Sequence, residues 1–285
     1  MKDKTILITG GSSGIGRATA VELASRGARL LVQGRTPERC EEAMDEIRRS
    51  ATGAPPELLQ ADLSSLAGVR SLAEAVSERT DHLDVLLNNA GLTLSSRQLT
   101  DDGFEKTFGV NHLAPFLLTG LLLPLLRRSP APRIVTVASE GHRFGKLDLD
   151  DLQNERRYAM LRVYGQSKTA NILFTVELAR RLEGTNVTAN CLHPGMIKSN
   201  LGRGNGALLD RVHDAIGIVL YPFFKTAEQG AQTSLHLVAS PDVADASGRY
   251  FANKRPSRPS AHATNPETAG RLWAISEQLT EFSYP

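Results

Sequence analysis

The regular pattern of the chain begins with Thr5-Ile6-Leu7-Ile8-Thr9-Gly10-Gly11-Ser12-Ser13-Gly14-Ile15-Gly16-Arg17. An apolar run long enough for a buried strand leads into a glycine-rich turn, and an amphipathic segment follows the turn. Glycine allows the backbone to approach a ligand closely, and a helix N-terminus offers N–H donors and the positive end of its dipole to an anion. A glycine-rich turn alone is weak support for a ligand. Its place between the first strand and the first helix predicts that it binds the pyrophosphate of a dinucleotide.

Short apolar segments and helical patterns alternate along most of the chain. Strands are predicted at residues 5–8, 28–33, 57–61, 83–87, 133–138, 187–192 and near 249–251, with a long helical region at 103–127 and a loop at 253–265. This alternation is typical of a parallel sheet with helices on both faces. We therefore predict an α/β protein with a Rossmann-type, doubly wound sheet of about seven strands. One domain is expected over residues 1–285, with a substrate-loop segment at about 201–225 and a C-terminal extension at about 240–285.

The composition is that of an ordinary globular protein, with 41% apolar and 22% charged residues among 285. A net charge of +2 is too small to predict binding to nucleic acid or to an anionic membrane. The cysteines Cys40 and Cys191 form neither a disulfide framework nor a zinc motif, which favours a cytoplasmic location. No signal peptide fits before the first strand. The most apolar stretch, residues 113–126, is too short to span a bilayer.

The end of the second predicted strand is expected to lie against the adenosine ribose of the dinucleotide. An acidic residue there would bind the 2′-hydroxyl of NAD, but the sequence reads Val32-Gln33-Gly34-Arg35-Thr36. Arg35 and Arg17 can instead pair with the 2′-phosphate of NADP, because guanidinium groups match phosphate oxygens. We therefore predict NADP(H) rather than NAD. The alternative is that Arg35 is a solvated loop residue.

A second motif, Tyr164-Gly165-Gln166-Ser167-Lys168, places a phenol and an ammonium four residues apart. Apolar residues at helical spacing follow, and positions i and i+4 share one helix face. A cation at ~4 Å, in an effective dielectric of about 20, attracts a phenolate by roughly 4 kcal/mol, or about three pKa units. That shift would bring the phenol towards working pH as a general acid or base. The same spacing is common on solvated helices.

Further motifs accompany these two in a fixed order. The set is Thr9-Gly10-x-x-x-Gly14-Ile15-Gly16, Asp62-Leu63, Asn88-Asn89-Ala90-Gly91, Asn111, Ser139, Tyr164-x-x-x-Lys168 and His193-Pro194-Gly195. This ordered set resembles the short-chain dehydrogenase/reductase family. Residues 164–196 and 228–233 are most similar to its retinol dehydrogenase and WW-domain oxidoreductase branch.

The resemblance implies a role for each matching residue. Tyr164 would be the general acid in reduction, Lys168 would lower its pKa and bind the nicotinamide ribose, and Ser139 would hydrogen-bond the substrate oxygen. Asn111 would hold a water that links Lys168 to solvent. The expected cofactor-binding residues are Gly10, Ser12, Ser13, Gly14, Ile15, Gly16, Arg17, Arg35, Asp62, Leu63, Asn89, Ala90, Gly91, Tyr164, Lys168, Pro194, Gly195, Ile197 and Ser199, the last standing where many members have threonine. No histidine is spaced for a metal.

The substrate pocket is expected to form from residues 140–147, Tyr158 and residues 201–224. Glycines followed by an apolar run in the last segment fit either a mobile lid over an apolar ligand or a packed helix. A retinoid-like aldehyde or a polyketide-like ketone is the expected substrate. The resemblance also implies a homodimer or homotetramer formed through the helix at 117–126 and the helix after Tyr164, although core burial explains the apolar residues of the former equally well. No membrane span is expected, because the apolar anchor of membrane-bound retinol dehydrogenases is not seen in this sequence.

We expect an NADP(H)-dependent carbonyl reductase or alcohol dehydrogenase. Two other classes stay open: a scaffold that senses NADP with little catalysis, and a reductase of an activated C=C bond in which Tyr164 protonates carbon or an enolate. Ser139, Asn111, Tyr164 and Lys168 are all present, which argues against a pure sensor, because a sensor has no need of the acid.

Overall fold

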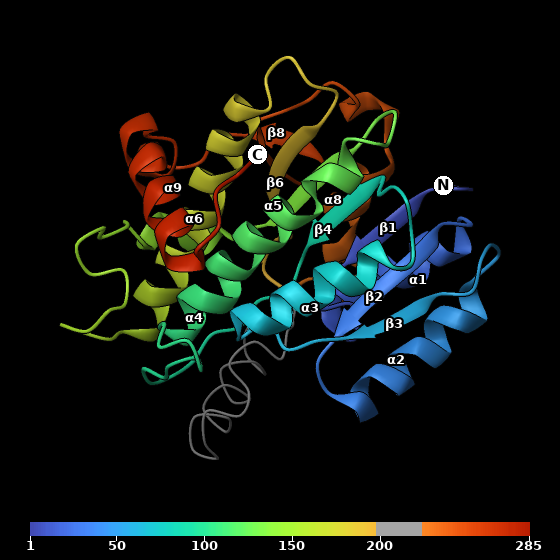
Figure 1. Cartoon of the computed structure of the whole chain (residues 1–285), viewed down its shortest axis with the longest axis horizontal. Helices are drawn as coiled ribbons and strands as arrows, with labels where there is room; N and C mark the ends of the chain where they lie inside the picture. Colours follow the sequence, from blue (N-terminus) through green and yellow to red (C-terminus); the bar gives the residue numbers. More distant parts are fainter. Residues whose placement is uncertain (198–223) are drawn as a thin grey trace.

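The computed structural model describes residues 1–197 and 224–285, and this part of the chain contains one sheet of eight strands (Figure 1). The strands are β1 (Thr5–Ile8), β2 (Arg29–Gly34), β3 (Glu57–Gln60), β4 (Val85–Asn88), β5 (Arg133–Val137), β6 (Thr188–His193), β7 (Tyr250–Ala252) and β8 (Arg255–Ser257). Their order is β3-β2-β1-β4-β5-β6-β7-β8, and only the pair β7–β8 is antiparallel. The predicted doubly wound, mostly parallel sheet is confirmed.

The eighth strand lies where the sequence predicts a loop. Asn253 and Lys254 have positive φ angles of 50° and 64°, as in the tight turn of a two-residue hairpin. β8 is exposed and pairs only with β7, so it forms the edge of the sheet, where Pro256 needs no further ladder partner. A short, exposed strand with proline and basic residues shows no apolar alternation, so a sequence pattern does not reveal it.

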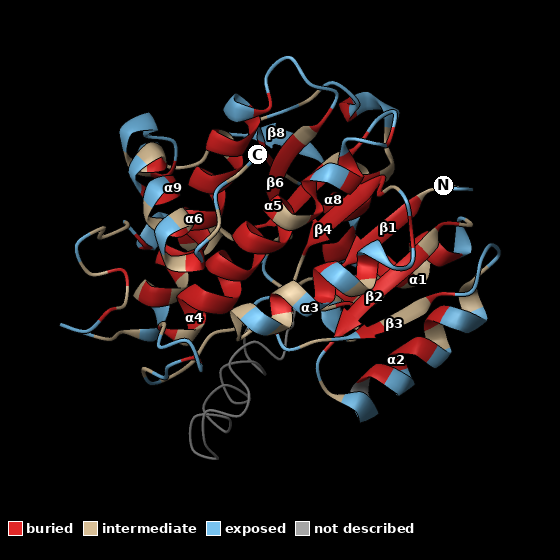
Figure 2. Ribbon diagram, viewed as in Figure 1, coloured by how far each residue is buried: buried red, intermediate tan, exposed pale blue. Residues whose placement is uncertain are grey.

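Two layers of helices bury the sheet (Figures 1 and 2). One face carries α1 (Gly14–Ser25), α2 (Pro37–Ser50) and α8 (Ala227–Ala239), and the other carries α3 (Leu66–Ser77), α5 (Ala114–Leu126) and α6 (Met160–Arg181). A further helix, α9 (Pro266–Thr280), packs along α6. The short strands are apolar on both sides because both sides are covered.

The predicted helical region at 103–127 is confirmed as one continuous helical stretch at Lys106–Leu126, but it is not a regular α-helix throughout. A short helix, α4 (Lys106–Phe108), leads into a π-helical turn at Gly109–Leu113, and α5 begins only after it. Pro115 has no N–H to give to the carbonyl of Asn111 four residues earlier, so the regular α-helical ladder cannot pass through this point. Single π-helical turns of this kind are common at functional sites, and this one contains Asn111.

Residues Lys106–Leu126 form the one described helical stretch that is long and apolar enough to cross a membrane, with a mean hydropathy of 1.5 in its most apolar window. That window is 89% buried within the protein, as expected for a core helix. Part of the cover comes from the C-terminal segment: the Tyr284 hydroxyl donates to the Phe116 carbonyl at 2.6 Å, and Phe282 lies against Gly120. Most of α5 is therefore buried within the protomer, and the predicted dimer or tetramer stays a prediction.

Candidate active site

The predicted site residues meet at the carboxyl edge of the sheet. β1 ends before Thr9, β4 before Asn89, and β5 is followed closely by Ser139. β1 lies between β2 and β4, so the chain winds away from it in opposite directions on its two sides. Ligands of open α/β sheets bind in the crevice at such a switch point.

The glycine-rich turn is shaped to receive an anion. Gly10 and Gly14 have positive φ angles of 64° and 51°, which other residues rarely adopt. A Cβ on Gly16 would lie 2.3 Å from the Gly10 carbonyl oxygen, whereas one on Gly14 would meet nothing within 4 Å. The first turn of α1 follows, and its N-cap residue Ser13 makes no side-chain capping bond. The open space at Gly14 and the helix N-terminus together fit a pyrophosphate.

Two buried amides hold this turn in place. The Gln33 side chain, 3% exposed, accepts from the Gly10 N–H at 2.8 Å and donates to the Ala61 carbonyl at 2.7 Å. Asn89 donates to the Thr9 carbonyl at 2.8 Å. The Asn89 side chain therefore supports the glycine-rich turn by a hydrogen bond to the backbone of that turn. Gln33 was not among the predicted site residues, and its only sequence signal is a polar residue within an apolar strand.

The two candidate phosphate-binding arginines lie in different surroundings. Arg35 follows β2, is exposed, and its guanidinium makes no hydrogen bond or ion pair with the residues the structure describes. Arg17 instead forms an ion pair with Glu42 of α2 at 3.2 Å and a second, closer one with Glu46. To reach a phosphate, Arg17 would have to leave both carboxylates. Arg35 is thus the better-placed residue.

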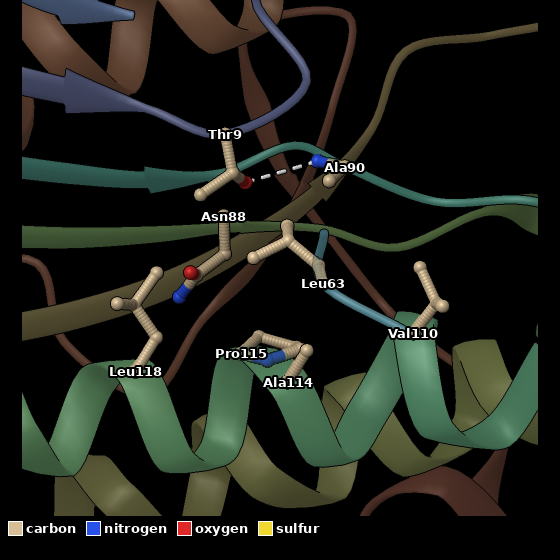
Figure 3. Close-up of a pocket in the computed structure, with 8 residues that line it drawn as sticks. All are labelled: Thr9, Leu63, Asn88, Ala90, Val110, Ala114, Pro115 and Leu118. Atoms are coloured by element: carbon tan, nitrogen blue, oxygen red, sulfur yellow. Dashed lines mark hydrogen bonds between the residues drawn. The ribbon is translucent and has the colours of Figure 1, made fainter. Parts of the chain in front are cut away.

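The predicted adenine side of the site contains a small cavity (Figure 3). Leu63, Ala90 and Val110 line it together with Thr9, Asn88 and residues of α5, and its volume is about 10 Å³, room for about one water. Asp62, which precedes Leu63, is exposed and accepts from the Ser64 N–H at 2.8 Å. The sequence prediction included Leu63 and Ala90 but missed Val110, which precedes Asn111.

Ser139 and Tyr164 lie close together although 25 residues separate them. Ser139 follows β5, and its hydroxyl accepts from the Gly141 N–H at 3.1 Å, starting a 3₁₀ helix at Glu140–Phe144. A Cβ on Gly141 would lie 3.3 Å from the Tyr164 ring, so the turn passes directly over the phenol. Burial raises the pKa of Tyr164, and a side-chain hydrogen bond with Ser139 opposes that shift. The phenol is therefore a proton donor at neutral pH.

Lys168 lies on the same face of α6 as Tyr164, as predicted. Its ammonium is 5.7 Å from the centre of the Tyr164 ring and donates to the Val137 carbonyl at 2.9 Å. Burial lowers the pKa of Lys168 to about 8. Burial thus disfavours the charged forms of both Tyr164 and Lys168, and the lowering of the Tyr164 pKa by the lysine stays a prediction.

Asn111 is fully buried and its carboxamide is hydrogen-bonded to protein groups. Its oxygen accepts from the Leu92 N–H at 2.8 Å, and its nitrogen donates to the Ser167 hydroxyl at 2.9 Å. A Cβ on Gly91 would lie 3.3 Å from this oxygen and 3.4 Å from the Lys168 ammonium. The side chain therefore joins the segment after β4 to α6, and the water expected at Asn111 stays a prediction.

A close contact between two glycines sets the distance between the Ser139 segment and α6. A Cβ on Gly145 would lie 1.9 Å from the Gly165 carbonyl carbon and 2.1 Å from the Gln166 nitrogen. A Cβ on Gly165 would lie 2.6 Å from the Gly141 carbonyl oxygen. Only glycine at both positions lets the 3₁₀ helix rest on the first turns of α6.

The segment after β6 is described as far as Ile197. Gly195 has a φ of 97°, and its N–H donates to His193 Nδ1 at 3.0 Å. Ile197 bridges to Lys225 and packs against Gly230 of α8. Ser199 and nearly all of the predicted lid, residues 201–224, lie outside the described residues. The predicted pocket residue Tyr158 donates its hydroxyl to the Leu94 carbonyl at 2.9 Å.

The sequence and the fold match known proteins across most of the chain. Residues 4–207 match the short chain dehydrogenase family. Mouse retinol dehydrogenase 14 is 46% identical over 98% of this chain and 86% of that protein, and human retinol dehydrogenase 13 is 40% identical over 99% and 86%. Among solved structures, an uncharacterised protein from Mycobacterium paratuberculosis has a TM-score of 0.79 at 34% identity, covering 100% of this chain and 96% of that one. A Burkholderia cenocepacia short chain dehydrogenase in complex with NADP has a TM-score of 0.68 at 28% identity, covering 88% and 96%.

The chain belongs to the short-chain dehydrogenase/reductase family, whose members are oxidoreductases that use a nicotinamide cofactor. Within that family it is a member of the retinol dehydrogenase branch, as its motifs predicted.

Proposed function

We propose that this protein is an NADP(H)-dependent oxidoreductase that interconverts a lipophilic carbonyl compound and its alcohol. The observation that carries the proposal is the meeting of Ser139, Tyr164 and Lys168 beside the glycine-rich turn at the switch point of the sheet. No one of these residues is informative alone. Together they offer an anion cradle, a proton donor and a buried cation at the same edge of the sheet.

The nicotinamide supplies or accepts the hydride when bound. Gly10, Gly14 and Gly16 would hold its pyrophosphate against the N-terminus of α1. Tyr164, kept neutral by burial, would give its proton to the carbonyl oxygen, and Ser139 would hold that oxygen in reach. Lys168 would supply positive charge next to the phenol as the proton leaves.

Three exposed apolar side chains, each close in sequence to a site residue, support a lipophilic substrate. Phe144 is 79% exposed at the end of the Ser139 segment, Leu161 is 71% exposed one turn before Tyr164, and Met196 is 59% exposed just after Gly195. Covering such side chains with an apolar ligand would remove apolar surface from water, which is favourable. The relatives named retinol dehydrogenases also favour a lipophilic substrate. A polyketide-like ketone is lipophilic too and stays a second candidate.

A substrate panel tests the proposal. NADPH oxidation is followed with all-trans-retinal, a medium-chain aldehyde, a cyclic ketone and an α,β-unsaturated ketone, and the products are identified. We expect at least one lipophilic carbonyl to give its alcohol. A product with an intact carbonyl and a saturated C=C bond would replace the proposal with enone reduction. NADPH binding without turnover of any compound in the panel would favour the alternative of a scaffold that senses NADP.

The cofactor preference can be tested at Arg35. Replacing its free guanidinium in Arg35→Asp removes one charge-assisted contact to the 2′-phosphate and adds a group that can bind a ribose hydroxyl. We expect kcat/KM for NADPH to fall by about 10- to 100-fold while that for NADH stays equal or rises. The control is Arg49→Asp, an identical charge change at the exposed C-terminal end of α2. An unchanged NADPH/NADH ratio in Arg35→Asp would assign the 2′-phosphate to another residue.

A further inference from the structure

A group of polar side chains lies beside the catalytic residues without belonging to them. Glu140 directly follows Ser139, and its carboxylate receives three contacts. His193 Nε2 lies 3.2 Å from Oε2, the Tyr250 hydroxyl donates to the same oxygen at 3.3 Å, and Arg143 pairs with Oε1. The Tyr250 ring stacks on His193 with centroids 6.0 Å apart and planes at 15°. The end of β5, the end of β6 and β7 are thereby joined at one carboxylate.

The hydrogen bonds of His193 define its protonation state. Nδ1 accepts the Gly195 N–H at 3.0 Å, so Nδ1 carries no proton and Nε2 must carry it. The protonated Nε2 then lies 3.2 Å from Glu140 Oε2. A doubly protonated imidazole could keep the Glu140 contact but would turn an N–H towards the Gly195 N–H. The imidazole ring therefore contacts both the Gly195 segment and Glu140 only in its neutral form, with the proton on Nε2.

We propose that His193 is a positioning residue, whose neutral Nε2–H tautomer couples the Pro194-Gly195 segment to the Ser139 segment through Glu140. The two contacts have separable consequences. The Gly195 contact fixes a backbone turn with φ of 97° at the predicted nicotinamide position. The Glu140 contact fixes the first residue of the 3₁₀ helix that starts at Ser139.

The surroundings of His193 favour the neutral form. Burial lowers the pKa of His193, Lys225 and Arg143 lower it further, and Glu140 opposes them. The uncharged Tyr250 ring covers one side of the imidazole. His142, on the far side of Tyr250, is held as the opposite tautomer: its Nδ1 donates to the Ser139 carbonyl at 2.7 Å and its Nε2 accepts the Ser260 N–H at 3.1 Å.

Two isosteric substitutions separate the contacts. Asparagine can place its amide oxygen near the Nδ1 position and keep an acceptor for Gly195, whereas glutamine can place its amide nitrogen near Nε2 and keep a donor for Glu140. We expect His193→Gln to raise KM for NADPH about tenfold with kcat within about threefold of wild type. His193→Asn should instead lower kcat about tenfold, with KM for NADPH within about threefold of wild type.

The pH profile gives a further readout. Wild-type kcat/KM should fall about tenfold per pH unit below the His193 pKa, and both variants should lose this decrease at acid pH.

The control is His82→Gln, the same change on an exposed histidine at the opposite edge of the sheet. This inference rests on the proposed function for its kinetic readout, so a second measurement is independent of turnover. The ¹⁵N shifts of His193 at pH 7 should show a protonated Nε2 and an unprotonated Nδ1. A protonated Nδ1, or variants with wild-type kinetics and the same decrease at acid pH, would overturn the proposal, whereas absence of reductase activity with the expected tautomer would overturn only the proposed function.

Discussion

Tyr164→Phe should lower kcat for carbonyl reduction by at least about 100-fold, because a positioned general acid contributes about 10²–10⁴ to the rate. The phenylalanine ring keeps the packing against Gly141 and the Lys168 ammonium and removes only the hydroxyl that faces Ser139. NADPH affinity should therefore stay within a few-fold of wild type. Steady-state turnover and quenching of intrinsic fluorescence by NADPH measure the two quantities separately.

The matched control is Tyr284→Phe, which removes a hydroxyl from an equally buried ring whose partner is the Phe116 carbonyl, in the C-terminal segment. It should reduce stability slightly, by about 1 kcal/mol for one lost hydrogen bond, and leave turnover intact. If Tyr164→Phe kept more than a tenth of wild-type kcat, another group would have to be the acid.

Gly145→Ala should damage both stability and catalysis. Its new Cβ would lie 1.9 Å from a backbone carbon of Gly165, and no flexible side chain can move aside. The 3₁₀ helix and α6 must separate, at a cost of about 1–3 kcal/mol for overpacking. Because Ser139 and Tyr164 lie on the two separated elements, a displacement of about 1 Å can cost about 100-fold in turnover. Thermal unfolding and kcat at a temperature where the variant is folded measure the two effects.

Gly270→Ala provides the comparison. This glycine lies within α9, and a Cβ there would meet nothing within 4 Å. Alanine is a better helix former than glycine by about 1 kcal/mol, so the variant should be as stable as wild type or more stable. A Gly145→Ala protein with wild-type melting temperature and turnover would show that the segment relaxes without moving the site.

The parts of the fold that repeat were predictable from the sequence. Buried parallel strands are short apolar runs, and a helix follows each, so the alternation identifies the sheet without knowledge of its contacts. The glycine turn and the Tyr164–Lys168 pair were also recognisable, since each depends on residues close in sequence. β8 and the π-helical turn were not, because the first has no apolar pattern and the second arises from one missing N–H at Pro115.

What the sequence could not supply are contacts between distant residues. The pairing of Arg17 with Glu42 and Glu46 depends on the packing of α1 against α2. The joining of Glu140, His193 and Tyr250 depends on three strand ends. The cover that α9 and Tyr284 place over α6 and α5 likewise has no local signal. The oligomeric state stays a prediction.

The packing of α9 and Tyr284 over α6 and α5 also bears on the order in which contacts can form while the chain is synthesised. Phe116 and its neighbours on α5 acquire their last contacts only when Trp273 and Tyr284, more than 150 positions later, have left the ribosome. Until then the nascent chain carries an apolar helix surface with nothing over it, a feature that invites aggregation and engagement by chaperones. Closing such a long-range contact is also slow, since the entropy of the intervening loop is lost before the contact is gained. The contacts of Trp273 and Tyr284 with Phe116 are therefore expected to form late in folding.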